Sequence, residues 1–167
     1  MMKKLLFLTV LLAFGLTSFS QTAWTGFTNG EWTNPTNWTA GVPDAAVDVN
    51  IIVTLGGFLH EPIISTGGAE AKSITLTGLL DATPANLTIA DGGTLTVGGD
   101  ITITGVTLAS ASLVIDAGGI VTCHGDISNS NIMVVNGTLD NVAVTPVLKS
   151  AQTDGNTSED RASLENN

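Results

Sequence analysis

The 167 residues include fifteen acidic and five basic side chains, a net charge of −10, which leaves no basic patch for the phosphates of a nucleic acid and excludes that class of partner. The length fits one domain. Only 12% of the residues are charged, and Thr, Gly and small aliphatic residues dominate, a composition typical of many short strands joined by turns.

Residues 1–20 have the pattern of a signal peptide. Lys3 and Lys4 give it a positive start, Leu5–Leu16 is an apolar run too short to span a bilayer, and small residues precede a cleavage site expected before Gln21. We therefore expect an exported protein, secreted or at the cell surface, with no membrane insertion after cleavage. The mature part would keep three basic and all fifteen acidic residues, a net charge of −12.

Residues 21–50 differ from the rest because they contain all three tryptophans, Trp24, Trp32 and Trp38, among Gly, Asn and Pro residues that favour turns. We interpret this segment as a cap, since large aromatic side chains could cover the apolar first coil of a repeat structure. The alternative is a carbohydrate site in which the three indole rings stack on sugars.

The segment also carries a motif: Trp24-x-Gly26, Trp32-x-Asn34-Pro35-x-Asn37-Trp38, Gly41-x-Pro43 and Asp48-Val49-x-Ile51. It resembles the opening of large bacterial secreted and surface proteins that are adhesin-like and often use the type IX export route. The resemblance implies a right-handed parallel β-helix displayed outside a bacterial cell.

An internal repeat follows the cap. Leu87–Gly93 matches Leu113–Gly119, and with the same shift and no gap Thr96, Gly99, Asp100 and Ile101 match Thr122, Gly125, Asp126 and Ile127. Ile74–Gly78 matches Ile101–Gly105 with a shift that is longer by a single position. Short apolar and Thr strands repeating between Gly turns predict an all-β parallel β-helix, or β-solenoid, of roughly four coils over residues 51–148.

Strands are expected on either side of the repeat. Val49–Val53 is the first, Phe58–Ile64 is a less regular rung containing Pro62, and Asn131–Val135 and Gly137–Leu139 continue the rhythm. Val142–Leu148 is the expected last rung, where Pro146 limits pairing. The polar residues 149–167 are expected to form a disordered tail.

Cys123-His124 suggests a nucleophile or a metal site, but the repeat argues against both. Cys123 takes the place of Val97 and His124 that of Gly98, so we expect a buried, apolar Cys123. It is the only cysteine, so no internal disulfide is expected. The other histidine, His60, lies outside the matched repeat.

Asp100 and Asp126 share one repeat position, which predicts that they stack one coil apart, about 4.8 Å. Two carboxylates this close repel each other unless water or a cation lies between them. We favour two solvated Asp side chains at turns and expect no cofactor. The alternatives are a Ca²⁺ site or the acid pair of a polysaccharide-cleaving β-helix.

Two outward columns of hydroxyl side chains are predicted on one face: Thr75, Thr102 and Ser128, and beside them Thr77, Thr104 and Ser130. Thr-x-Thr rows of this kind resemble ice-binding β-solenoids. Thr is also a good outward strand residue in general.

Strand pattern is plentiful, and no set of catalytic groups converges. We therefore expect a structural or adhesin-type module without catalytic activity, with an extracellular glycan or a surface protein as partner. The alternatives are a carbohydrate-binding module or remnant of a polysaccharide-active enzyme, and an ice-binding solenoid. The sequence does not determine the oligomeric state.

Overall fold

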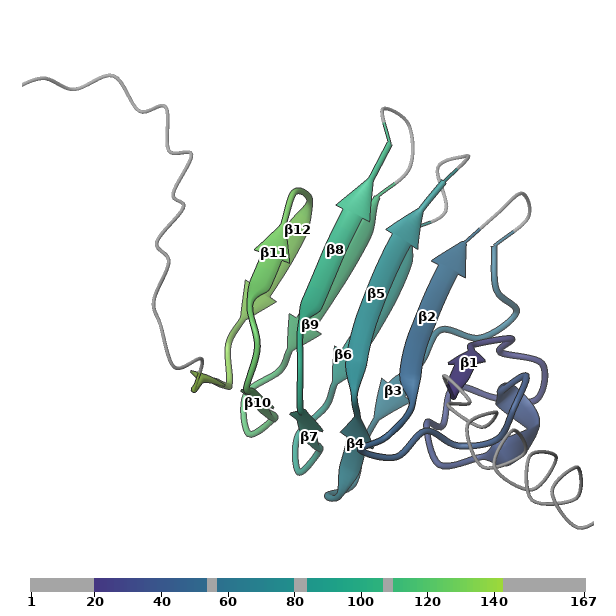
Figure 1. The fold of residues 1–167 in the computed structure, drawn as a ribbon, viewed down its shortest axis with the longest axis horizontal. Coiled ribbons are helices and arrows are strands. Elements are labelled where there is room, and N and C mark those ends of the chain that lie inside the picture. The colour runs from purple at the N-terminus through teal and green to yellow at the C-terminus, as the bar shows by residue number, and fades with distance from the viewer. Residues whose placement is uncertain (1–19, 54–56, 80–83, 107–109, 143–167) are drawn as a thin grey trace, which may run out of the picture.

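Parallel strands wind into a solenoid in the computed structural model, which describes residues 20–53, 57–79, 84–106 and 110–142 (Figure 1). The strands are β1 Gln21–Ala23, β2 Asp48–Val53, β3 Ile63–Ile64, β4 Ala69–Ala71, β5 Ser73–Gly78, β6 Ala85–Ile89, β7 Thr94–Val97, β8 Ile101–Gly105, β9 Ala111–Ile115, β10 Ile120–Cys123, β11 Ile127–Asn129, β12 Ile132–Val135 and β13 Thr138–Asn141. The described helical structure is one short 3-10 helix, η1 Pro35–Asn37.

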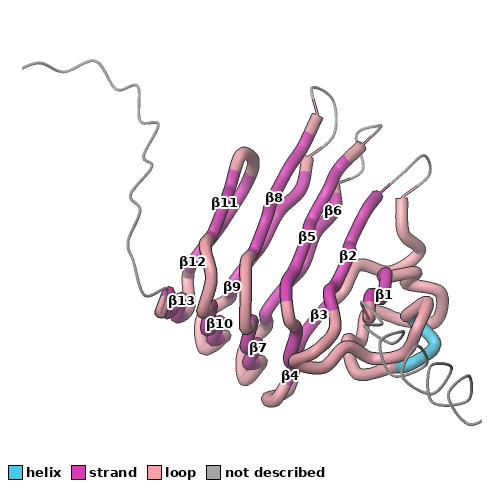
Figure 2. Tube along the Cα trace, in the orientation of Figure 1, coloured by secondary structure: helices cyan, strands magenta, loops and turns pink. Residues whose placement is uncertain are grey.

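Each coil contributes one strand to each of three parallel sheets (Figure 2). The first sheet has the order β1-β2-β5-β8-β11, the second β12-β9-β6-β3 and the third β13-β10-β7-β4. The coils are thus β2-β3-β4, β5-β6-β7, β8-β9-β10 and β11-β12-β13. The predicted all-β parallel solenoid of about four coils, with a tryptophan cluster near its N-terminal end, is confirmed.

The internal repeat corresponds to hydrogen-bonded neighbours. Leu87 pairs with Leu113, and Val97 pairs with Cys123, as the ungapped shift predicts. Ile74 pairs with Ile101, which confirms the slightly longer shift predicted for that part of the repeat. Residues that match in the sequence therefore lie one above the other on successive coils.

Alternation along each strand places every second side chain inside the solenoid. In β7, Leu95 and Val97 are buried and the two threonines are not, as the sequence predicts. The inward column of the first sheet runs through Val49, Ile74 and Ile101, each no more than 1% exposed. These stacked aliphatic side chains form one continuous core along the axis.

Glycine is required at one corner of the coil because neighbouring backbones approach closely there. A Cβ at Gly93 would collide with the Ile64 carbonyl of the preceding coil, and one at Gly119 would collide with the Ile89 carbonyl. This explains the second glycine of each Gly-Gly pair, and the first glycine, Gly92 or Gly118, has a positive φ of 77° or 86° that favours Gly.

The last coil is smaller than the coil before it. Ser112 pairs with Asn86 in the preceding coil and with Ile132 in the last coil. Fewer residues separate Ser112 from Ile132 than from Asn86. Ile120 is likewise closer in sequence to its later partner Thr138 than to its earlier partner Thr94. The loop between β11 and β12 and the turn between β12 and β13 are both shortened. The last coil therefore follows the strand rhythm of the repeat but not its length.

Two strands have no counterpart among the expected ones. β1 pairs with β2 and extends the first sheet into the tryptophan segment, so that segment is continuous with the solenoid. β4, the short Ala-Glu-Ala strand, closes the first coil. Most of the expected last rung, Val142–Leu148, lies outside the described residues, as do the expected signal peptide up to residue 19 and the tail at 149–167.

Candidate functional surfaces

The three tryptophans form a buried cluster at the N-terminal end of the solenoid. Trp24, Trp32 and Trp38 are 3%, 1% and 5% exposed. The ring of Trp38 meets Trp24 edge-on at a centroid distance of 4.9 Å and Trp32 at 4.7 Å. Buried rings present no face on which a sugar could stack, so this geometry favours the capping interpretation over the carbohydrate platform.

Two of the indole N–H groups attach the cluster to main chain. Trp24 Nε1 donates to the carbonyl of His60 at 2.8 Å, and Trp38 Nε1 donates to the carbonyl of Trp32 at 2.7 Å. The first bond links the cap to the loop before β3. A side chain at Gly26 would collide with the same His60 carbonyl, which explains the Trp-x-Gly spacing. The buried Nε1 of Trp32 has no acceptor among the described residues.

Asn37 organises the loop around the tryptophans. It is fully buried, and its Oδ1 accepts the backbone N–H groups of Thr28 at 3.0 Å and Asn29 at 3.3 Å. Its Nδ2 donates to Asn29 Oδ1 at 2.8 Å and to the Glu31 carbonyl at 3.0 Å. Asn34 caps η1 by accepting the N–H of Thr36 at 3.1 Å. The Asn residues of the motif are therefore structural.

Asp100 and Asp126 are neighbours on successive coils, as their shared repeat position predicts. Both are exposed, and Asp100 Oδ1 accepts the backbone N–H of Asp126 at 2.9 Å. The Asp100 carboxylate thus bonds one coil to the next. This arrangement favours turn-forming acids over a catalytic pair. The described residues contain no group of three or more His, Cys, Asp or Glu side chains that could hold a metal ion.

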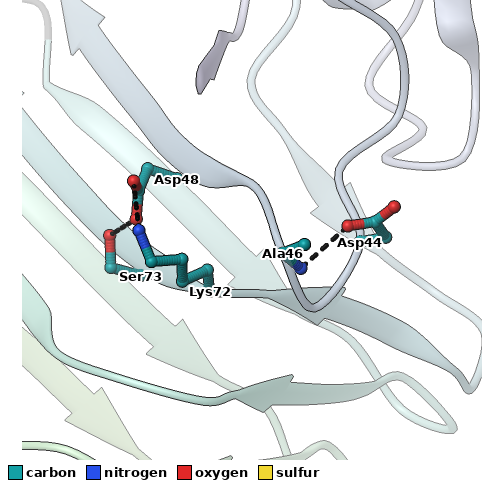
Figure 3. A network of polar contacts seen from close by, with 5 residues as sticks. All are labelled: Asp44, Ala46, Asp48, Lys72 and Ser73. Carbon is teal, nitrogen blue, oxygen red and sulfur yellow. Dashed lines mark hydrogen bonds and ion pairs between the residues drawn. The ribbon is translucent and has the colours of Figure 1, made fainter. Parts of the chain in front are cut away.

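A second acidic contact in the same outward column was missed by the sequence analysis. Asp48 accepts a hydrogen bond from Ser73 Oγ at 2.7 Å and forms an ion pair with Lys72 at 2.8 Å (Figure 3). The bond from Lys72, and secondly that from Ser73, lowers the pKa of Asp48. In the loop just before β2, the carboxylate of Asp44 accepts the backbone N–H of Ala46 at 2.8 Å (Figure 3). The pairing of Asp48 with Ser73 in the ladder is the pattern that could have revealed the contact.

A row of polar side chains also runs along the second sheet. Glu61 Oε2 accepts the N–H of Asn86 at 2.9 Å, and Ser112 Oγ donates to Asn86 Oδ1. Partial burial raises the pKa of Glu61. On the next coil, Asn131 Oδ1 accepts the N–H of Ala111 at 3.2 Å. Glu61, Asn86 and Asn131 each join their own coil to a neighbouring one.

Cys123 is in the core, as the repeat predicts. It is completely buried, and its thiol lies 3.4 Å from the Gly99 carbonyl. Burial raises the pKa of this thiol, which disfavours the reactive thiolate. His124 is exposed at the adjoining turn. His60 is also exposed and contributes its carbonyl, rather than its ring, to the Trp24 contact.

The hydroxyl columns lie on the outer face of the first sheet, which faces the viewer in Figure 1. Thr75 pairs with Thr102, and Thr102 pairs with Ser128. Beside them Thr77 pairs with Thr104. Ser130 lies just beyond β11, and its Oγ donates to the Ile103 carbonyl at 3.2 Å. Two successive coils therefore carry complete Thr-x-Thr rows.

No protein-family model matches this chain, and neither the curated proteins nor the solved structures include a match. Among the described residues, no helix is long and apolar enough to cross a bilayer.

Proposed function

We propose that this protein is a passive extracellular module, secreted or displayed at a bacterial surface, that presents the outer faces of its sheets to a glycan or a surface protein. The observation that carries the proposal is that charged and amide side chains connect the coils to one another. The side chains of Asp48, Glu61, Asn86 and Asp100 each form a hydrogen bond to the neighbouring coil. They lie in rows along the solenoid, and rows of this kind stiffen a scaffold.

The first sheet offers the most regular surface for contact. Thr75, Thr102 and Ser128 follow one another along successive coils. Successive coils are about 4.8 Å apart, so this face presents evenly spaced hydroxyl groups. The hydroxyl columns themselves carry no charge, and the acidic column of Asp48, Asp100 and Asp126 lies along one side of them. Evenly spaced hydroxyl groups of this kind fit the repeated hydroxyls of an extracellular polysaccharide. The resemblance of the tryptophan segment to adhesin-like surface proteins supports the same class of function.

A glycan array probed with the chain from Gln21 onward tests this proposal, together with polysaccharide hydrolysis assays on the same preparation. We expect binding without release of reducing sugars. Thr102→Lys, in the interior strand β8 of the first sheet, should weaken binding at least tenfold. Thr122→Lys is the matched control, because Thr122 lies outward at the centre of the third sheet. Hydrolysis of any polysaccharide, or equal effects of the two substitutions, would contradict the proposal.

An ice-binding face is the second candidate, favoured by one observation. The Thr75 and Thr77 row stacks in register on the Thr102 and Thr104 row. A thermal-hysteresis measurement with inspection of ice crystal shape decides this point. An ice-binding face requires shaped crystals that Thr102→Lys abolishes and Thr122→Lys leaves unchanged. Unshaped crystals from the unsubstituted protein would eliminate the candidate.

A further inference from the structure

The last described coil leaves the core open at one end. Six inward positions of this coil define its end face. Four carry apolar side chains, Ile127, Met133, Val135 and Leu139, and two carry amides, Asn129 and Asn141. Val135 is 43% exposed, whereas its partner in the preceding coil, Ile115, is fully buried. The other three apolar side chains are only partly buried. The end face is thus a mostly apolar cross-section of the solenoid.

Unpaired strand edges surround this face within the described part of the chain. β11, β12 and β13 are each the terminal strand of a sheet. In the first sheet, the N–H groups of inward residues point to the following coil: Ile74 donates to Asp100 at 2.9 Å, and Ile101 donates to Asp126 at 3.0 Å. The N–H groups of Ile127 and Asn129 occupy the same inward positions, so they point out of the end.

Most of the edge lacks the usual protection against pairing. Natural sheet edges commonly carry charged residues or Pro, which discourage association with another strand. β11 and β12 contain neither, and β13 contains one charged residue, Asp140, on its outward face. The apolar side chains and edge groups of residues 127–139 therefore favour a β-strand partner.

The register of the ladder argues against the chain itself as that partner. If the pairing of β10 with β13 continued, Pro146 would lie opposite Ser128. Outward residues donate their N–H to the preceding coil, as Ser130 does to the Ile103 carbonyl at 3.0 Å. Pro has no N–H to donate, so the ladder could not continue over β11 in this register.

We propose that the end face binds the end face of a second copy, forming a closed two-fold dimer. The chain segment around β1, which contains the three buried tryptophans, lies at the opposite end of the solenoid (Figure 1), so copies cannot add head to tail into a filament. A two-fold axis across the end reverses strand direction. β11 would then pair antiparallel with its own equivalent, and β12 with the partner's β13. β12 and β13 are each four residues long, so that pairing is complete.

Sedimentation equilibrium of the chain from Gln21 onward tests the dimer, at protein concentrations from about 1 to about 100 µM, where small interfaces dissociate. We expect a reversible shift from one to two chains. Val135→Lys should weaken association at least 100-fold, because it places two like charges in a closed apolar contact. Val134→Lys is the matched control, since Val134 is the adjacent residue, 39% exposed, on the outer face.

A second variant guards against loss of folding in the first. Asn129→Pro removes one N–H from the open edge and none from the ladder with β8, and it also removes the Oδ1 that accepts the N–H of Asn131 at 2.9 Å. Asn129→Ala, which loses only that acceptor, is its control. Asn129→Pro should weaken the dimer more than Asn129→Ala does, while the far-UV circular dichroism stays unchanged. A monomer at every concentration would overturn the proposal. Slow hydrogen exchange at Ile127 and Asn129 in such a monomer would show that a later segment of the chain covers the end.

Discussion

The two ends of the solenoid differ in how they finish the same repeat. At the N-terminal end, β1 extends the first sheet, and three buried tryptophans cover the first coil with bonds to specific carbonyl groups. At the other described end, the coil becomes shorter and its inward side chains are partly exposed. The N-terminal end is formed by residues that have no counterpart in the repeat. The other described end is formed by a shortened copy of the repeat.

This difference indicates where stability depends on individual side chains. In the coils, each backbone group repeats an interaction made one coil earlier, so a local loss is limited to neighbouring coils. In the cap, the side chain of Asn37 makes four hydrogen bonds that no repeated position duplicates. We therefore expect substitutions in the cap to cost more than similar substitutions in the last coil.

The largest difference is expected between Trp38→Ala and Met133→Ala. The first should lower the free energy of unfolding by about 4 kcal/mol, because it opens a cavity between two indole rings and removes the bond to Trp32. The second should lower it by about 1 kcal/mol, because Met133 is only partly buried in the monomer. Urea unfolding followed by circular dichroism measures both values. Equal losses would show that the last coil is as tightly packed as the cap.

An intermediate effect is expected for Asn37→Ala. The substitution leaves the N–H groups of Thr28 and Asn29 without their acceptor and should cost about 3 kcal/mol. Asn136→Ala is the control, because Asn136 is an exposed residue in a turn of the last coil. Its loss should stay below about 0.5 kcal/mol. A small effect of Asn37→Ala in thermal and urea unfolding would mean that the cap does not determine stability.

The smallest effect concerns pH and arises in the coil next to the cap. Asp48 has a lowered pKa, so its ion pair stabilises the fold above the ordinary Asp value of 3.8 and is lost as the pH falls through the lowered pKa. Glu61 has a raised pKa, so the fold loses stability as the pH rises from the ordinary Glu value of 4.5 through the raised pKa. The two groups act in opposite directions.

Two single substitutions separate these contributions. At pH 7, Asp48→Asn should destabilise the protein by less than about 1 kcal/mol, since Lys72 is half exposed to screening water. Glu61→Gln keeps an acceptor for Asn86 and should be neutral or slightly stabilising at pH 7. Each difference should disappear at low pH, where the carboxyl group is protonated in both folded and unfolded chains. Urea midpoints measured from about pH 2 to about pH 7 check both, because the lowered pKa of Asp48 requires the lower limit. A difference that persists at low pH would rule out titration as its cause.

The coils could be predicted from the sequence because stacking imposes the same environment on matched positions. Leu87 and Leu113, or Val97 and Cys123, fill the same place in successive coils, so their spacing reports the register directly. The neighbouring positions of Asp100 and Asp126 followed from the same spacing.

The remaining features have no such pattern. β4 has two alanines in place of β-branched residues, so its composition does not favour a strand, and only its pairing with Leu95 and Val97 assigns it. Trp24 binds a main-chain carbonyl at His60, which no side-chain pattern encodes. The shortening of the last coil changes two loops at once and removes the constant spacing on which the alignment depended.

The constant spacing of the ladders β6–β9, β7–β10 and β8–β11 has a consequence for how such a molecule can change its length. Residues 85–110 run from the start of β6 to the residue before β9. Ala85 pairs with Ala111, so the segment begins and ends at equivalent positions of successive coils. A tandem duplication of this segment would add one complete coil, lengthening the solenoid by about 4.8 Å while leaving the cap and the last coil unchanged. Unequal recombination within the gene could therefore produce scaffolds of different reach without any new packing arrangement.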